Sequence, residues 1–198
     1  MARPREFDED EVLTAAMQVF WDRGYAATSM RDLTDELGLN PSSLYRAFAD
    51  KHTLFLRALD RYTETESAAL REAIRAGGPL RATLRDWLLG LIDELCVDRR
   101  GCMLVNAATE LASSDPATQA RAQAAFAAIR DALETVLDDA QRGGELNDDV
   151  DPAASAELLL SVVIGLKVQG RVGAPRERLE QAVDAAMDGL TGDARPAT

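Results

Sequence analysis

The chain has 198 residues, of which 46% are hydrophobic and 5% aromatic, and its formal net charge is −12. This length allows one or two domains, and a composition rich in Ala and Leu without long alternating strand-like runs excludes a β-rich protein and predicts an all-α fold. Two cysteines and an N-terminus without an apolar signal core exclude a disulfide framework and indicate a cytoplasmic protein. No stretch is expected to span a membrane.

In chain order, a first helix is expected over residues 8–24, and two short helices around a glycine turn follow at residues 28–48. Thr28 is expected to cap the first of this pair, and Gly38 ends it in a left-handed conformation. Asn40 and a following proline supply the cap and first position of the second helix. This layout is typical of a helix-turn-helix, which places its second helix in the DNA major groove. The alternative is an ordinary helical hairpin.

The second helix of the pair is short and polar on its outer face. Leu44 and Phe48 are expected to point inward, which leaves hydroxyl, phenol and guanidinium groups to face a ligand. The candidate DNA-binding residues are Arg31, Ser42, Ser43, Tyr45, Arg46 and Lys51. Arg3 and Arg5 form a basic arm before them. Because acidic residues share this region, the expected contact with DNA is narrow and strongly salt-dependent.

The rest of the chain is expected to be a larger helical domain over residues 53–190, after a DNA-binding domain over 1–52. Gly-Gly turns and Asp-Pro starts separate its apolar stripes, so about nine helices are predicted in all. Beyond the first three, these helices are expected over residues 50–76, 80–95, 102–112, 115–142, 152–173 and 175–190. Residues 191–198 are expected to form a disordered tail.

Residues 8–60 resemble the DNA-binding domain of the tetracycline-repressor (TetR) family. The matching segments are Arg23-Gly24-Tyr25, Leu37-Gly38-Leu39, Ser43-Leu44-Tyr45-Arg46-Ala47-Phe48 and Lys51. The resemblance implies a homodimeric repressor that binds a palindromic double-stranded operator and is released by a small effector. It further implies that Ser43, Tyr45 and Lys51 contact phosphates or bases and that Arg46 reads a base. Pro41 and Ser42 depart from the family pattern, which often has a basic residue and a glycine there, and Ala47 replaces a frequent aromatic residue.

A second segment, Arg100-Gly-Cys-Met-Leu-Val-Asn106, resembles a TetR subgroup that includes electrophile- and oxidant-responsive repressors. The resemblance implies that Cys102 senses a reactive species. Its expected place at a helix start beside Arg99 and Arg100 favours a thiolate. The alternative is a buried structural cysteine that packs as a small hydrophobe.

An effector pocket is expected among the helices between about residues 80 and 170. The candidate lining residues are Trp87, Leu91, Cys102, Met103, Asn106, Glu110 and Phe126. The helix over 152–173 is apolar nearly all round, so a homodimer interface is expected through residues 152–190. No cofactor or metal is expected, because the single histidine cannot supply a di-iron motif and no phosphate-binding glycine loop is present. These observations argue against an enzyme, and the main alternative is a helical interaction module without DNA binding.

Overall fold

The structure is a computed structural model that describes residues 8–191, and within this range the chain folds into helices without a strand, which confirms the all-α prediction. The helices are α1 (Glu9–Arg23), α2 (Met30–Leu37), α3 (Pro41–Phe48), α4 (Lys51–Ala76), α5 (Leu80–Val97), α6 (Met103–Leu111), α7 (Pro116–Arg142), α8 (Pro152–Arg171) and α9 (Arg176–Thr191). The basic arm with Arg3 and Arg5 and the tail over 192–198 lie outside the described residues. Thr191, expected in that tail, is the last residue of α9.

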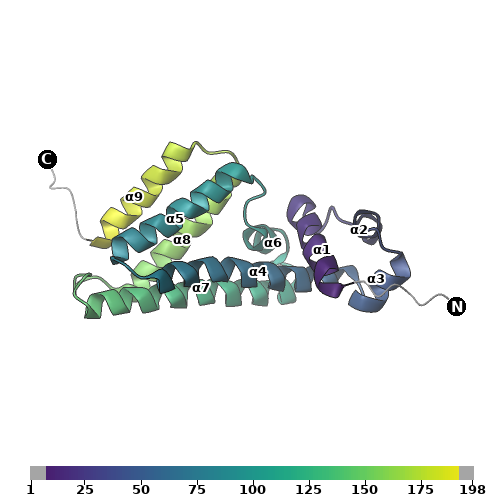
Figure 1. The fold of residues 1–198 in the computed structure, drawn as a ribbon, viewed down its shortest axis with the longest axis horizontal. Helices are drawn as coiled ribbons and strands as arrows, with labels where there is room; N and C mark the ends of the chain where they lie inside the picture. The colour runs from purple at the N-terminus through teal and green to yellow at the C-terminus, as the bar shows by residue number, and fades with distance from the viewer. Residues whose placement is uncertain (1–7, 192–198) are drawn as a thin grey trace.

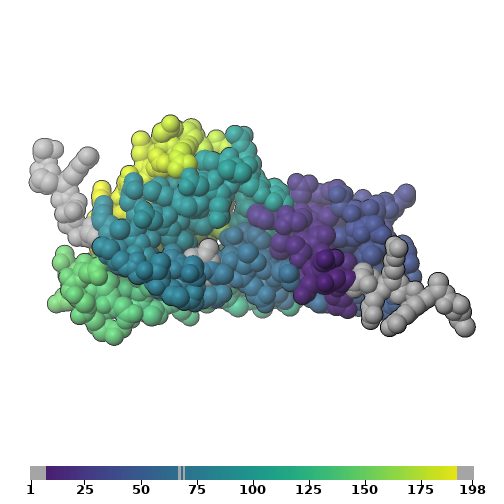
Figure 2. All heavy atoms as spheres, viewed as in Figure 1, coloured from purple at the N-terminus to yellow at the C-terminus, as the bar shows by residue number. Residues whose placement is uncertain are grey.

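The molecule is elongated, with α1–α3 at one end and α5, α8 and α9 at the other (Figure 1). The long helices α4 and α7 run side by side along its length, and α6 lies between the two ends. In the space-filling view the N-terminal block, purple to blue, forms one end of this body (Figure 2). α4 belongs to both ends, because it packs against α1 and α3 at one end and against α5 and α7 toward the other.

Two hydrophobic clusters hold the fold together. The first contains Phe20, Phe48 and Phe55 from α1, α3 and α4, and it also takes in the start of α6 from Cys102 to Ala107. The second joins the end of α4 to α5, α7, α8 and α9. The domain boundary expected at residue 52 therefore falls inside α4, next to a cluster that already includes residues of α6.

The expectation that no segment is long and apolar enough to cross a membrane was wrong for α8. This helix has 20 residues with a mean hydropathy of 1.4 in its most apolar window, of which 33% is buried within the chain. Length and composition alone make this weak evidence for a membrane span, since a core helix passes the same criterion. Its inner face packs on α5, α7 and α9, and its outer face leaves Leu158, Val168 and the adjoining Val172 exposed.

Candidate functional site

Side-chain caps form the helix-turn-helix as predicted, except at its first residue. Ser29 caps α2, not Thr28: the Ser29 hydroxyl accepts from the Asp32 N–H, and the Asp32 carboxylate accepts from the Ser29 N–H. Gly38 ends α2 in the left-handed region at φ 63°, and Asn40 caps α3 by accepting from the Ser43 N–H.

Thr28 is buried, which explains why it does not cap the helix. Its hydroxyl donates to the Gly24 carbonyl at 2.7 Å, so it closes the loop between α1 and α2. Sequence position alone does not distinguish two adjacent hydroxyl residues, because either one suits an N-cap.

The outer face of α3 is polar and free of acidic side chains. Leu44 and Phe48 anchor the helix in the first cluster, while Ser42, Tyr45 and Arg46 are exposed. Tyr45, at 49% exposure, is one of the large apolar side chains that the chain leaves in solvent. A helix held by two inward residues and presenting hydroxyl, phenol and guanidinium groups matches the chemistry that reads phosphates and base edges.

The two remaining basic candidates have partners within the chain. Arg31 is exposed and lies 3.7 Å from Asp35 on α2. The Lys51 amine donates to the carbonyls of Tyr25 and Thr28 at 3.0 and 2.9 Å and lies 4.0 Å from the centre of the Tyr25 ring. Lys51 therefore fixes the loop between α1 and α2 to the start of α4, a role that sequence analysis missed.

Long-range polar contacts join the helix-turn-helix end to α6. Glu110 of α6 accepts from the backbone N–H groups of Tyr25 and Ala26 at 3.1 and 2.7 Å. The Trp21 indole donates to the Gly101 carbonyl at 2.9 Å, just before α6. α6 therefore joins two regions. Glu110, near its end, holds the α1–α2 loop, and Cys102, at its start, borders the interior of the C-terminal part.

A further polar contact lies where α4 and α7 begin. His52 of α4 lies 2.9 Å from the carboxylate of Asp115, which also accepts from the Thr118 hydroxyl. The Thr118 bond, the His52 bond and the backbone N–H groups of α7 lower the pKa of Asp115 from 3.8 to about 2.

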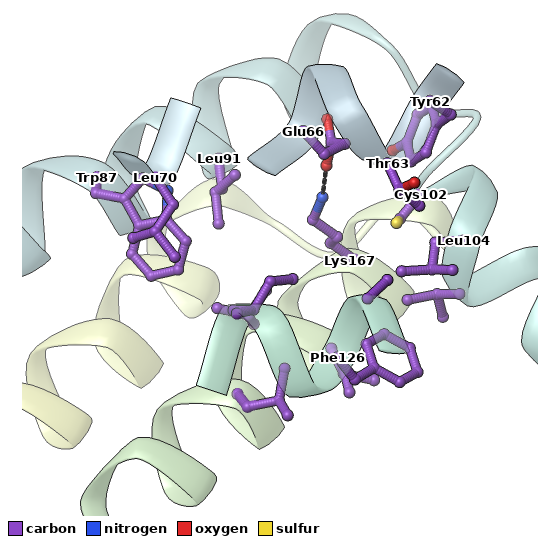
Figure 3. A pocket seen from close by; sticks show the side chains of 16 residues that line it. Tyr62, Thr63, Glu66, Leu70, Trp87, Leu91, Cys102, Leu104, Phe126 and Lys167 are labelled. Atoms are coloured by element: carbon purple, nitrogen blue, oxygen red, sulfur yellow. Dashed lines mark hydrogen bonds and ion pairs between the residues drawn. The ribbon is translucent and has the colours of Figure 1, made fainter. Parts of the chain in front are cut away.

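A cavity of about 40 Å³ lies between α4, α5, α6, α7 and α8. Figure 3 shows Trp87 and Leu70 at one side of it and Tyr62, Thr63 and Cys102 at the other. The remaining lining residues are Glu66, Leu91, Leu104, Val105, Ala125, Phe126, Ile129, Leu160, Val163, Ile164 and Lys167. The walls are mainly aliphatic and aromatic, as in small-molecule sites with a few oriented polar groups.

An ion pair between Lys167 of α8 and Glu66 of α4 crosses this apolar cavity (Figure 3). Burial acts to lower the pKa of Lys167, but the neighbouring Cys102 and Glu66 side chains outweigh it, so this pKa lies above its ordinary value. Burial, and then the charge of Glu66, raises the pKa of Glu94 beside the pair. Lys167 is therefore a charged ammonium group, paired with Glu66, in a mainly apolar site.

Cys102 is buried at the start of α6 and lines the cavity, whereas Cys96 is exposed and neither forms a disulfide. Burial raises the pKa of Tyr62, and the neighbouring Cys102 side chain raises it further. The thiol thus faces the cavity, a position that fits both a sensing thiol and a buried structural cysteine.

Comparison with known proteins identifies the family of both the helix-turn-helix part and the C-terminal part of the chain. Residues 12–58 match the bacterial regulatory proteins described as the tetR family, and residues 78–187 match the tetracyclin repressor-like C-terminal domain. The chain belongs to the TetR family. It is a DNA-binding, helix-turn-helix transcriptional regulator of that family.

TetR-family relatives cover nearly the whole chain. The uncharacterized HTH-type transcriptional regulator YezE of Bacillus subtilis is 33% identical over 96% of this chain and 100% of its own length. The transcriptional repressor ComR of Escherichia coli is 31% identical, over 93% of this chain and 90% of its own. A cysteine-substituted form of the TetR-family regulator CifR, in complex with 26-bp double-stranded operator DNA, is 31% identical with a TM-score of 0.85 and covers 96% of this chain and 100% of that one.

Within this TetR-family fold, only part of the expected pocket set lines the cavity. Trp87, Leu91, Cys102 and Phe126 do. Met103 packs in the first cluster, Asn106 donates to the Arg100 carbonyl, and Glu110 turns to the α1–α2 loop. Tyr62 and Glu66 of α4 also line the cavity but were not expected there, because the pocket was expected among the helices between about residues 80 and 170. Lys167, a polar residue in the apolar helix expected over 152–173, was not among the expected lining residues either.

Proposed function

We propose that this chain is a cytoplasmic, homodimeric repressor that binds a palindromic operator through α3 and releases it when a small effector occupies the cavity. The polar face of α3, free of acidic side chains in a chain of net charge −12, is the observation that carries this proposal. The proposed contacts to DNA are Arg31, Ser42, Ser43, Tyr45, Arg46 and Lys51. A local basic patch suffices to displace phosphate counterions even when the whole protein is acidic.

A labelled-DNA binding assay on the gene's own upstream region, repeated over a series of salt concentrations, tests this proposal. Each phosphate contact contributes about −0.9 to the slope of log affinity against log salt. Arg46→Ala is expected to cost about 1–3 kcal/mol on the specific sequence and to relax sequence preference, if Arg46 reads a base. Arg130→Ala is the matched control, because Arg130 lies on α7 and pairs with the adjacent Asp131.

Two results would contradict the proposal: equal affinity for all duplexes, or no binding even at low salt. The second would favour the helical interaction module instead. The matched relatives are named as transcriptional regulators, and this favours DNA binding and argues against an enzyme.

The outer face of α8 supports the homodimer. Exposed or half-buried small and apolar residues follow one another there at alternating spacings of four and three residues, as in a helix–helix seam. They are Ala154, Leu158, Ser161, Gly165, Val168 and Val172. Together with α9, this stripe is the proposed four-helix interface between two copies.

Gly165→Arg tests the interface without disturbing the subunit. A Cβ atom at Gly165 would meet only the Gln169 amide, at 4.0 Å, so the single chain has room for a side chain there. The variant is expected to sediment as a folded monomer with unchanged helix content and to lose most operator affinity. A wild-type protein that sediments as a monomer at micromolar concentration would contradict the dimer.

Modification of the Cys102 thiol is a second proposed input, because this thiol lines the same cavity. N-ethylmaleimide treatment is expected to weaken operator binding of the wild type and of Cys96→Ser, but not of Cys102→Ser. Equal responses of all three proteins would assign Cys102 a structural role.

A further inference from the structure

The cation of the cavity is isolated among apolar and acidic groups. Lys167 is the one basic side chain among the described residues that line the cavity. A second cavity of about 40 Å³ lies against the same ion pair and shares Tyr62, Glu66, Leu91 and Lys167 with the first. It adds the carboxylate of Glu94 and that of Asp98, which is paired with Arg100. The two cavities therefore differ in that Glu94 lines only the second, while the Lys167–Glu66 pair borders both.

The two partners of the ion pair differ in their access to water. The Lys167 side chain is 11% exposed and that of Glu66 is 27% exposed. A cationic ligand that paired with Glu66 would leave Lys167 charged, buried and without its partner, which is a costly arrangement. An anionic ligand that paired with Lys167 would free Glu66 to turn toward solvent and away from Glu94. The difference in exposure therefore favours an anion on the apolar side of Lys167.

The walls of the first cavity specify the rest of the ligand. Trp87 and Phe126 provide aromatic surface, and the leucine, isoleucine and valine residues provide the remainder. At about 40 Å³ the cavity accommodates little more than water, whereas a cavity of about 150 Å³ accommodates a benzene ring. Any ligand with an apolar body must therefore push the helices apart, so it binds an expanded state better than the present one.

We propose that the effector is a compact apolar carboxylic acid whose carboxylate replaces Glu66 as the partner of Lys167. This inference rests on the proposed function and specifies the chemistry of its effector. Glu66 lies on α4, and α4 begins at Lys51, which fixes the loop before the helix-turn-helix. Release of Glu66 therefore removes one tie between α4 and α8 at the same time as the apolar body separates these helices.

Calorimetry without DNA tests the ligand class. The probes are 4-phenylbutyrate and octanoate, each compared with the alcohol and the primary amine of the same carbon skeleton at pH 7.5. The carboxylates are expected to bind at least tenfold more tightly than their alcohols and amines. Tighter binding of the amines, equal binding of all three classes, or no binding of either carboxylate would overturn the proposal.

Two substitutions test the exchange of partners. Lys167→Met keeps a side chain of similar length and is expected to weaken carboxylate binding at least tenfold while leaving alcohol binding within threefold. Glu66→Gln removes the competing carboxylate and is expected to strengthen carboxylate binding about three- to tenfold. Arg85→Met is the matched control, because it removes the Arg85–Asp184 ion pair between α5 and α9, away from both cavities.

Glu66→Gln keeps the test decisive if Lys167→Met fails to fold, since unchanged or weaker carboxylate binding by Glu66→Gln would overturn the exchange.

A DNA-release assay is run separately. Carboxylate binding that leaves operator affinity unchanged would overturn the coupling through Glu66. A protein that binds the carboxylates but no operator would overturn the proposed repressor function and leave the ligand class standing.

Discussion

The two ends of the molecule differ in how far apart in the sequence their functional residues lie. At the DNA-binding end, caps and helix ends come from neighbouring residues, such as Ser29 with Asp32 and Asn40 with Ser43. At the cavity end, the central ion pair joins Glu66 to Lys167, which are 101 residues apart. The first end therefore forms a recognisable local pattern, whereas the second exists only after α4, α5, α7 and α8 have packed.

The largest expected effect comes from breaking the long-range packing of the cavity end. Gly170 of α8 lies against α5 so closely that a Cβ atom there would be 2.9 Å from the Leu95 Cβ. Gly170→Val is expected to cost about 3 kcal/mol or more in unfolding free energy, because α8 must move away from α5. Urea denaturation monitored by circular dichroism measures this loss.

Gly90→Ala is the matched control for that substitution. Gly90 is also helical, on α5, but an added Cβ there meets no atom within 4 Å. The control is expected to be neutral or to stabilise the protein by up to about 1 kcal/mol, through helix propensity alone. If both glycine variants are equally stable, the close contact between α5 and α8 is not a determinant of the cavity end.

An intermediate effect is expected where the two ends meet, at Asp115. Because the pKa of Asp115 in the folded state, about 2, lies below its ordinary 3.8, its contribution to stability is present above about pH 4 and is lost as the pH falls toward 2. Asp115→Asn keeps an oxygen that can cap α7 but removes the charge facing His52. Its stability is therefore expected to decline less steeply than that of the wild type below pH 4.

Urea unfolding at pH 3 and pH 6 measures the difference. Asp151→Asn is the control, because Asp151 caps α8 through the N–H groups of Ala153 and Ala154 and has no histidine partner. If the stabilities of the wild type and of Asp115→Asn fall in parallel between pH 6 and pH 3, Asp115 makes no pH-sensitive contact between the two ends.

The same contrast explains what the sequence could and could not predict. Apolar spacing, Gly38 and Pro41 predicted α2 and α3, because these signals act within a few residues. Met103, Asn106 and Glu110 were expected in the pocket because they share a short helix with Cys102. The direction in which each side chain of α6 points depends on what packs around that helix, and no local signal specifies it. Glu110 binds the α1–α2 loop for this reason, unpredicted by any pattern near it.

The smallest expected effect belongs to the local geometry of the DNA-binding end. Ala49 ends α3 with φ 59° and ψ −59°, and it is the one non-glycine residue with positive φ among those described. The Asp50 N–H donates to the Phe48 carbonyl at 2.6 Å across it, as in a strained γ-turn. Ala49→Gly is expected to leave stability unchanged or raise it by up to about 1 kcal/mol, because relief of strain offsets the greater freedom of glycine in the unfolded chain. A thermal melt and the operator assay measure both consequences. A loss of operator affinity with no loss of stability would mean that the strained turn itself orients α3 on the DNA.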